Sequence, residues 1–116
     1  MTNQEAFETM VRHLRKQGCQ SVSEHGTRCL YRGPNGRMCA VGCLIPDDQY
    51  KRSFEGETAE CIAKKVPALS DIEPGILSEM QCIHDDCDVS QWEEGFKGVA
   101  RYCKLTLPPL EEVPHA

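Results

Sequence analysis

Aromatic residues and long apolar runs are both scarce in this sequence. One tryptophan, three tyrosines and three phenylalanines occur among 116 residues. No apolar segment approaches the roughly 18 residues that a membrane-spanning helix needs, which argues against a transmembrane anchor. Residues 1–18 contain acidic side chains and an amphipathic stripe in place of the basic start and apolar stretch of a secretory signal. We therefore expect a soluble, cytoplasmic protein that binds no membrane.

Positive charge is scarce in the second half of the chain. Residues 1–65 hold ten Lys or Arg and eight Asp or Glu, a net charge of +2, while residues 66–116 hold three and ten, a net charge of −7. No basic stripe is present, so nucleic acid is not expected as the main ligand, because affinity for a phosphate backbone depends on clustered positive charge. The acidic half is suited to a protein partner with a basic or mixed surface, and equally to a solvated surface.

Eight cysteines are present, but they lack the spacing of a typical zinc site. Structural zinc sites usually contain two close ligand pairs, and this sequence has no C-x2-C pair. A straight strand would hold Cys39 and Cys43 roughly 13 Å apart, so zinc requires a bend between them. The residues that could then contribute are Cys39, Cys43, Cys82, His84 and Cys87. The alternative is a set of reduced thiols that pack as small apolar side chains, with no cofactor.

Helical periodicity is clear near both ends of the chain. Apolar residues predict a helix over residues 3–17, with a capping box at Thr2 and Glu5 and a stop at Gly18. A shorter helix is predicted after Thr58.

Two further helices follow in the second half. One is expected from Pro74 to about Asp85. The last is expected to begin with a second capping box, formed by Ser90 and Glu93, and to bury one apolar face. Residues 1–104 are predicted to form a single domain, and residues 105–116, which contain two proline interruptions, an extended or mobile tail.

The middle of the chain has the pattern of a β-hairpin. Residues 28–32 and 37–45 are predicted as strands, because turn-forming residues occupy positions 33–36 between them. Apolar and small residues fill both faces of the second strand, which indicates a strand buried inside the domain. The expected fold class is therefore α+β, with a hairpin over about 28–45 and about four helices packed against it.

The same region carries a specific motif. Residues 29–50, CLYRGPNGRMCAVGCLIPDDQY, fit the pattern Y-R-x-x-x-G-x-x-C-A-x-G-x-L-I-P-D. An E-G pair follows at Glu55 and Gly56, then LSEMQCIHDD at residues 77–86, and later Trp92. With these motifs the chain resembles short proteins of bacteriophages and prophages, from the first helix to about Lys104.

The resemblance departs from the family pattern at Met80, where the family has leucine, and in the tail, which has no counterpart. It brings no known activity with it. It implies a small phage-type accessory protein that binds a host protein, as in host takeover or anti-defence, and that is not an enzyme. The candidate contact residues are Tyr31, Arg32, Asp47, Tyr50, Glu55, Asp85, Asp86 and Asp88.

Two other classes of function stay open. A metal- or cysteine-dependent enzyme would use Cys39, Cys43, His84 and Asp85, because a thiolate near a base is a nucleophile and a His-Asp pair can bind a divalent cation. A structural or assembly-accessory protein would self-associate or attach to phage particles. Some contact candidates also have structural alternatives, since Tyr31 and Arg32 could hold the hairpin together and Asp47 could cap a helical turn.

Overall fold

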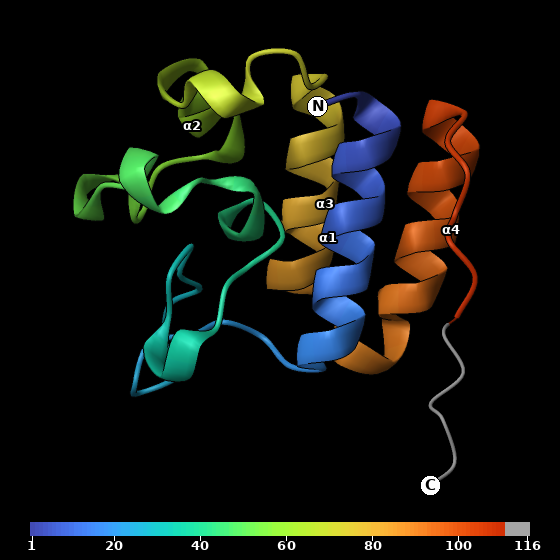
Figure 1. Cartoon of the computed structure of the whole chain (residues 1–116). Coiled ribbons are helices and arrows are strands. Elements are labelled where there is room, and N and C mark those ends of the chain that lie inside the picture. Colours follow the sequence, from blue (N-terminus) through green and yellow to red (C-terminus); the bar gives the residue numbers. More distant parts are fainter. Residues whose placement is uncertain (111–116) are drawn as a thin grey trace, which may run out of the picture.

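The computed structural model describes residues 1–110, which form helices, 3₁₀ turns and coil (Figure 1). The four α-helices are α1 (Asn3–Gln17), α2 (Ala59–Lys65), α3 (Pro74–Asp86) and α4 (Trp92–Cys103). Six short 3₁₀ turns lie at Pro34–Gly36, Gly42–Leu44, Asp47–Gln49, Arg52–Phe54, Pro67–Leu69 and Val89–Gln91. Helices α1, α3 and α4 lie side by side, and the coil between α1 and α2 folds over one flank of this bundle.

Helix α1 confirms the local signals in its sequence. The Thr2 hydroxyl accepts from the Glu5 N–H at 3.1 Å, and the Glu5 carboxylate accepts from the Thr2 N–H at 2.9 Å, so the capping box is complete. Gly18 ends the helix with a φ of 68°, a left-handed conformation that glycine adopts without strain.

The start of α4 differs from the prediction. The helix begins at Trp92, and no side chain caps it. The predicted capping box of Ser90 and Glu93 is wrong, because the 3₁₀ turn Val89–Gln91 runs directly into the helix and gives the chain helical geometry before the helix begins. The Glu93 carboxylate instead accepts two hydrogen bonds from the Arg15 guanidinium, at 2.7 and 2.8 Å.

The predicted α+β fold is wrong. Residues 1–110 contain no strand or sheet, only two isolated antiparallel bridges, at Val22–Cys29 and at Arg32–Met38. The chain does reverse direction at the predicted turn, where Asn35 and Gly36 both have positive φ. Beyond that turn, however, residues 39–44 coil into a buried turn instead of continuing as a strand.

Side chains take the place of a neighbouring strand in this buried turn. The Met38 N–H donates to the Gln17 side chain at 2.9 Å, and the Val41 N–H donates to the Gln81 side chain at 3.1 Å. Buried backbone donors require a partner, and a glutamine carbonyl serves as well as a strand does. The alternating apolar residues therefore reflect burial on all sides rather than a strand between two layers.

The apolar faces of the helices meet in one core. The completely buried side chains of α1 pack with those of α3 and α4, and the turn that contains Val41 packs against α1. The largest apolar side chains that are almost completely buried are Phe7, Met10, Leu14, Ile62, Leu69, Ile72, Leu77, Met80 and Phe96.

Part of the predicted tail lies against the bundle. Thr106 exchanges two hydrogen bonds with the Gln4 side chain, at 2.7 and 2.8 Å. Arg15 donates to the backbone carbonyls of Pro108 and Pro109 at 2.9 and 3.2 Å. Residues 111–116 of the predicted tail lie outside the described residues.

Candidate functional site

Glu55 is the centre of a hydrogen-bond network in the region that was expected to form the hairpin. Its carboxylate accepts from the backbone N–H of Tyr31 at 2.8 Å and from that of Arg32 at 3.1 Å. The Tyr50 hydroxyl donates to the same carboxylate at 2.6 Å. Hydrogen bonds to a charged acceptor are roughly twice as strong as neutral ones, so Glu55 fixes the backbone at Tyr31 and Arg32.

Arg32 extends this network. Its guanidinium donates to the Asp47 carboxylate at 2.6 Å and to the Ile45 carbonyl at 2.5 Å, and it lies 5.1 Å from the centre of the Tyr50 ring. These contacts favour a structural role for Arg32 and Tyr50 over a role in contacting a partner. The Asp47 side chain is 94% exposed, so it contributes little stability and can still reach a partner.

His84 is completely buried where three segments meet. Its ring stacks on the Trp92 ring of α4, with 5.9 Å between centres and 28° between planes. The Ser21 N–H donates to Nε2 at 2.9 Å, so this nitrogen must carry a lone pair. The ring hydrogen therefore resides on Nδ1, which donates to the Asp85 carboxylate at 2.6 Å. His84 thus joins the connector after α1 to α3 and α4.

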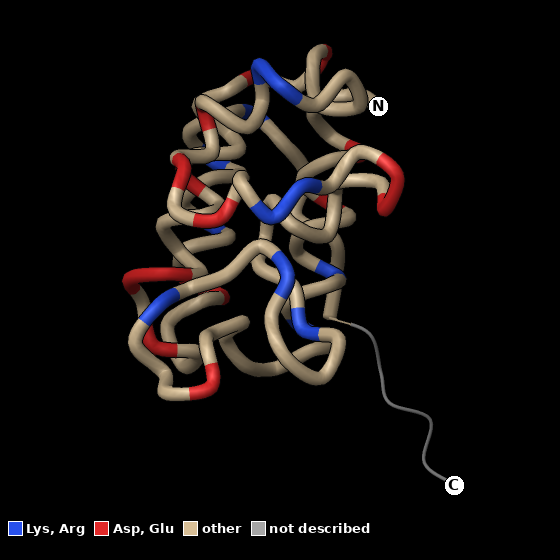
Figure 2. Tube along the Cα trace, turned by 90° about the vertical axis from the view of Figure 1, so that its left-hand side faces the viewer, with Lys and Arg blue, Asp and Glu red and all other residues tan. Residues whose placement is uncertain are grey.

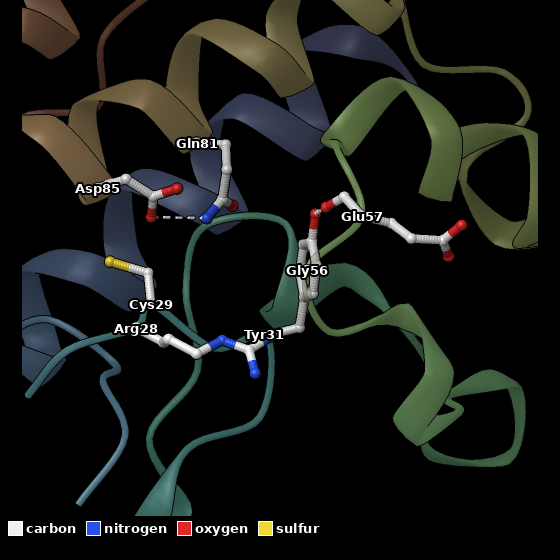
Figure 3. A pocket seen from close by; sticks show the side chains of 7 residues that line it. All are labelled: Arg28, Cys29, Tyr31, Gly56, Glu57, Gln81 and Asp85. Carbon is white, nitrogen blue, oxygen red and sulfur yellow. Dashed lines mark hydrogen bonds between the residues drawn. The ribbon is translucent and has the colours of Figure 1, made fainter. Parts of the chain in front are cut away.

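A polar pocket of about 270 Å³ opens beside this junction (Figure 3). It is lined by Arg28, Cys29, Tyr31, Gly56, Glu57, Gln81 and Asp85. The Gln81 amide donates to Asp85 at 2.9 Å, and the Tyr31 hydroxyl donates to the Glu57 carbonyl. The walls are therefore held by hydrogen bonds before any ligand enters, which is a general property of binding sites.

Cys29, His84 and Asp85 are the group in residues 1–110 that could hold a metal ion, with ligand atoms within 4.8 Å of one another. The hydrogen bonds oppose this use. A metal on Nδ1 would force the ring hydrogen onto Nε2, where it would face the Ser21 N–H donor. His84 and Asp85 are thus better described as members of a hydrogen-bond chain with Ser21 and Gln81 than as metal ligands.

Of the residues predicted for the zinc and enzyme sites, His84 and Asp85 belong to this group, whereas Cys39, Cys43, Cys82 and Cys87 belong to no such group within residues 1–110. Cys39 is buried in the core turn, and the Cys43 thiol donates to the Ala40 carbonyl at 3.0 Å. Cys82 lies on the exposed side of α3. His84 has both ring nitrogens engaged by Ser21 and Asp85, so neither is free to accept a proton from a cysteine.

Burial suppresses the reactivity of several thiols. It raises the pKa of Cys39 strongly and that of Cys43 to about 12, while burial and the Asp85 carboxylate raise the pKa of Cys29 to about 11. The thiolate is the nucleophile, and at pH 8 a thiol with such a pKa has a thiolate fraction roughly 100-fold or more below that of a free cysteine. These cysteines are therefore poorly suited to nucleophilic catalysis.

We expect the exposed Cys61 to react fastest when the native protein is treated briefly with iodoacetamide at pH 8, and Cys39 to react only after unfolding. Peptide mapping by mass spectrometry measures each site, and the same reaction in guanidinium chloride is the control. Rapid native alkylation of Cys29 or Cys39 would contradict this expectation and favour the cysteine-enzyme hypothesis.

The outer side of α3 and the segment after it carry unpaired negative charge. The carboxylates of Asp86 and Asp88 are exposed, and they form no hydrogen bond or ion pair with any residue among 1–110. We call these two residues the α3 acidic surface. Asp85, next to them, faces the pocket. Figure 2 shows that several acidic segments follow one edge of the molecule.

Residues from three separate parts of the motif meet at the pocket. Tyr31, Gly56, Gln81 and Asp85 line it. Glu55 does not line the pocket, but its carboxylate accepts a hydrogen bond from the backbone N–H of Tyr31 and holds that residue in place. Sequence reasoning missed Arg28, Cys29 and Glu57 as pocket residues, and it did not foresee the linking role of Gln81. The E-G pair and the residues Gln81 to Asp85 of the motif could have indicated a shared site. Their spacing in the sequence does not show that they lie close together in space.

Comparison of the chain with protein-family models, with curated proteins and with solved structures gives no match. No helix in residues 1–110 has the length and apolar character needed to cross a bilayer. The case for a function therefore depends on the geometry of the pocket and of the α3 acidic surface.

Proposed function

We propose that the protein acts by binding another protein through the face that contains the polar pocket and the α3 acidic surface. The partner is a protein with a basic or mixed surface. Given the resemblance to phage proteins, it is a host protein, and the role is an accessory one such as host takeover or anti-defence.

The convergence of the motif on one pocket is the observation that carries this proposal. Its parts lie far apart in the sequence, yet they form the walls of one pocket and hold Tyr31 in place. The exposed carboxylate of Asp86 is close enough to raise the pKa of Cys29 in that pocket. Unpaired charges of one sign attract a partner of the opposite sign and steer its approach.

The geometry gives the enzyme hypothesis less support. A cysteine nucleophile needs a nearby base with a free lone pair, and the buried His84 uses both ring nitrogens in hydrogen bonds. Burial also raises the pKa of the Cys29 thiol, the one that lines the pocket. Binding requires neither a thiolate nor a free base.

We expect the double variant Asp86→Asn/Asp88→Asn to retain at least about tenfold less of its partner from a host lysate, because it loses two charges from the contact face. Asp85 is left unchanged in this test, since it supports the buried His84. Quantitative mass spectrometry of the captured proteins measures the ratio, and the loss should shrink in high salt.

The matched control is Asp48→Asn/Asp71→Asn, which removes the same charge at two other exposed positions. It should retain the partner as the parent does. A partner that both double variants retain equally would place the contact elsewhere, and a well-folded parent that retains no protein near stoichiometry would contradict the binding function.

A further inference from the structure

We infer that the polar pocket receives an arginine side chain of the partner. The Asp85 carboxylate would accept hydrogen bonds from its guanidinium, and the Tyr31 ring would form the opposite wall. This inference rests on the proposed function, and it assigns the chemistry of the group that enters the site.

Asp85 has acceptor capacity to spare. Its Oδ1 accepts from both Gln81 and His84, at 2.9 and 2.6 Å. The second oxygen, Oδ2, remains to accept from the Cys29 thiol or from a ligand. The Asp85 side chain is 32% exposed, so a group entering from solvent can reach it. A fixed carboxylate of this kind favours a donor that is itself charged.

Carboxylates act on two of the groups that line the pocket. Besides burial, the carboxylates of Asp85 and Asp86 raise the pKa of the Cys29 thiol. Burial and then the acidic groups around Tyr31, including Asp85 and Glu57, raise the pKa of its hydroxyl. The contribution of the carboxylates to each shift favours a cation, whereas the contribution of burial disfavours a charge of either sign.

Arg28 is the cationic residue of the lining, and its charge weakens the attraction of the site for a second guanidinium. Its side chain lies at the pocket against Gly56, where a Cβ atom would come within 3.2 Å of its guanidinium (Figure 3). It is exposed, and no residue among 1–110 forms a hydrogen bond or ion pair with its side chain. Arg28 therefore opposes an incoming cation and can move aside.

The size and shape of the pocket favour one side chain over a larger ligand. Its volume of about 270 Å³ is below the usual range of pockets for drug-sized molecules. An arginine is planar and carries five donors, so it can bond to a carboxylate and stack on an aromatic ring at the same time. Asp85 and Tyr31 line the pocket from opposite sides (Figure 3). Tyr31 is 5% exposed, so the guanidinium would meet only the part of the ring that faces the pocket.

The test is a titration of the ¹⁵N-labelled full chain with N-acetyl-arginine amide, followed by the backbone amide signals of the pocket residues. The uncharged isostere N-acetyl-citrulline amide is the matched ligand control. We expect saturable shifts at Cys29, Tyr31 and Gln81 with a Kd of about 1–10 mM, as is usual for a fragment of an interface. The citrulline compound should produce none below about 20 mM.

Three variants make the outcome specific. Asp85→Asn keeps a carbonyl oxygen for Gln81 and His84, so it should stay folded yet bind at least about tenfold more weakly. Arg28→Gln should bind about threefold more tightly, because it removes a like charge. Asp71→Asn, which alters a carboxylate outside the pocket lining, should leave the Kd unchanged.

The inference is overturned if no pocket signal saturates below about 20 mM, or if citrulline binds equally well. It is also overturned if Arg28→Gln abolishes binding, which would indicate an anionic or zwitterionic ligand. Failure of the proposed function would be a separate result. The titration with N-acetyl-arginine amide needs no partner protein, and the capture of a partner from lysate is tested with changes at Asp86 and Asp88, which lie outside the pocket lining. If the protein binds N-acetyl-arginine amide but captures no partner, the inferred chemistry of the pocket stands and the proposed protein-binding function is contradicted.

Discussion

Replacing Gly42 with alanine is expected to lower the free energy of unfolding by at least about 3 kcal/mol, which is at the upper end of overpacking effects. A Cβ atom at this position would lie 2.1 Å from the Tyr31 carbonyl oxygen and 2.9 Å from the Tyr31 carbonyl carbon. Both are backbone atoms, so no side-chain rotation relieves the clash. The Tyr31 backbone is also held by Glu55, which resists a shift.

Equilibrium denaturation followed by circular dichroism measures this loss. Gly98→Ala is the matched control, since nothing lies within 4 Å of its Cβ position in α4. That control should be neutral or should stabilise the protein by up to about 1 kcal/mol, because alanine is the better helix former. Equal stability of the two variants would mean that the segments at Gly42 and Tyr31 do not approach as closely as described.

Replacing His84 with alanine is expected to cost about 3–4 kcal/mol of unfolding free energy. The change leaves a cavity beside Trp92, removes the acceptor for the buried Ser21 N–H and deprives Asp85 of a donor. His84→Gln restores a carbonyl acceptor and should recover part of the loss. Chemical denaturation of the purified variants measures all of these differences.

His25→Ala is the control for this substitution, because His25 is exposed and its change should alter stability by less than about 0.5 kcal/mol. If His84→Ala and His25→Ala proved equally stable, His84 would not link the three segments. A second consequence concerns the pocket. His84→Gln should weaken the binding of N-acetyl-arginine amide, since Asp85 loses the ring donor that orients it.

Part of the candidate site could be predicted from sequence and part could not. The motif contains Tyr31, Glu55 and Asp85, and the structure gives these residues different surroundings. Glu55, a predicted contact residue, accepts hydrogen bonds from the backbone at Tyr31 and Arg32. Asp85 lines the pocket. A carboxylate at a given position has the same sequence signature whether it meets a partner or its own backbone.

The sequence by itself determined the helices. Helix α1 follows from its apolar spacing, the capping box at Thr2 and the left-handed Gly18, all of which act within a few residues. Helix α3 begins at Pro74 as predicted and ends at Asp86, one residue beyond the predicted end. Such signals are local, because helical hydrogen bonds join residues close in the chain.

Only the tertiary structure decided the form of residues 28–45 and the assembly of the pocket. An apolar run predicts burial, but a strand also needs a partner for its backbone groups, and here Gln17, Gln81 and Glu55 supply the acceptors from distant positions. The burial of His84 likewise depends on Ser21, which lies 63 residues away in sequence. Contacts between residues so far apart produce no repeating pattern in a single sequence. The helices could therefore be predicted from neighbouring residues, whereas the pocket could not.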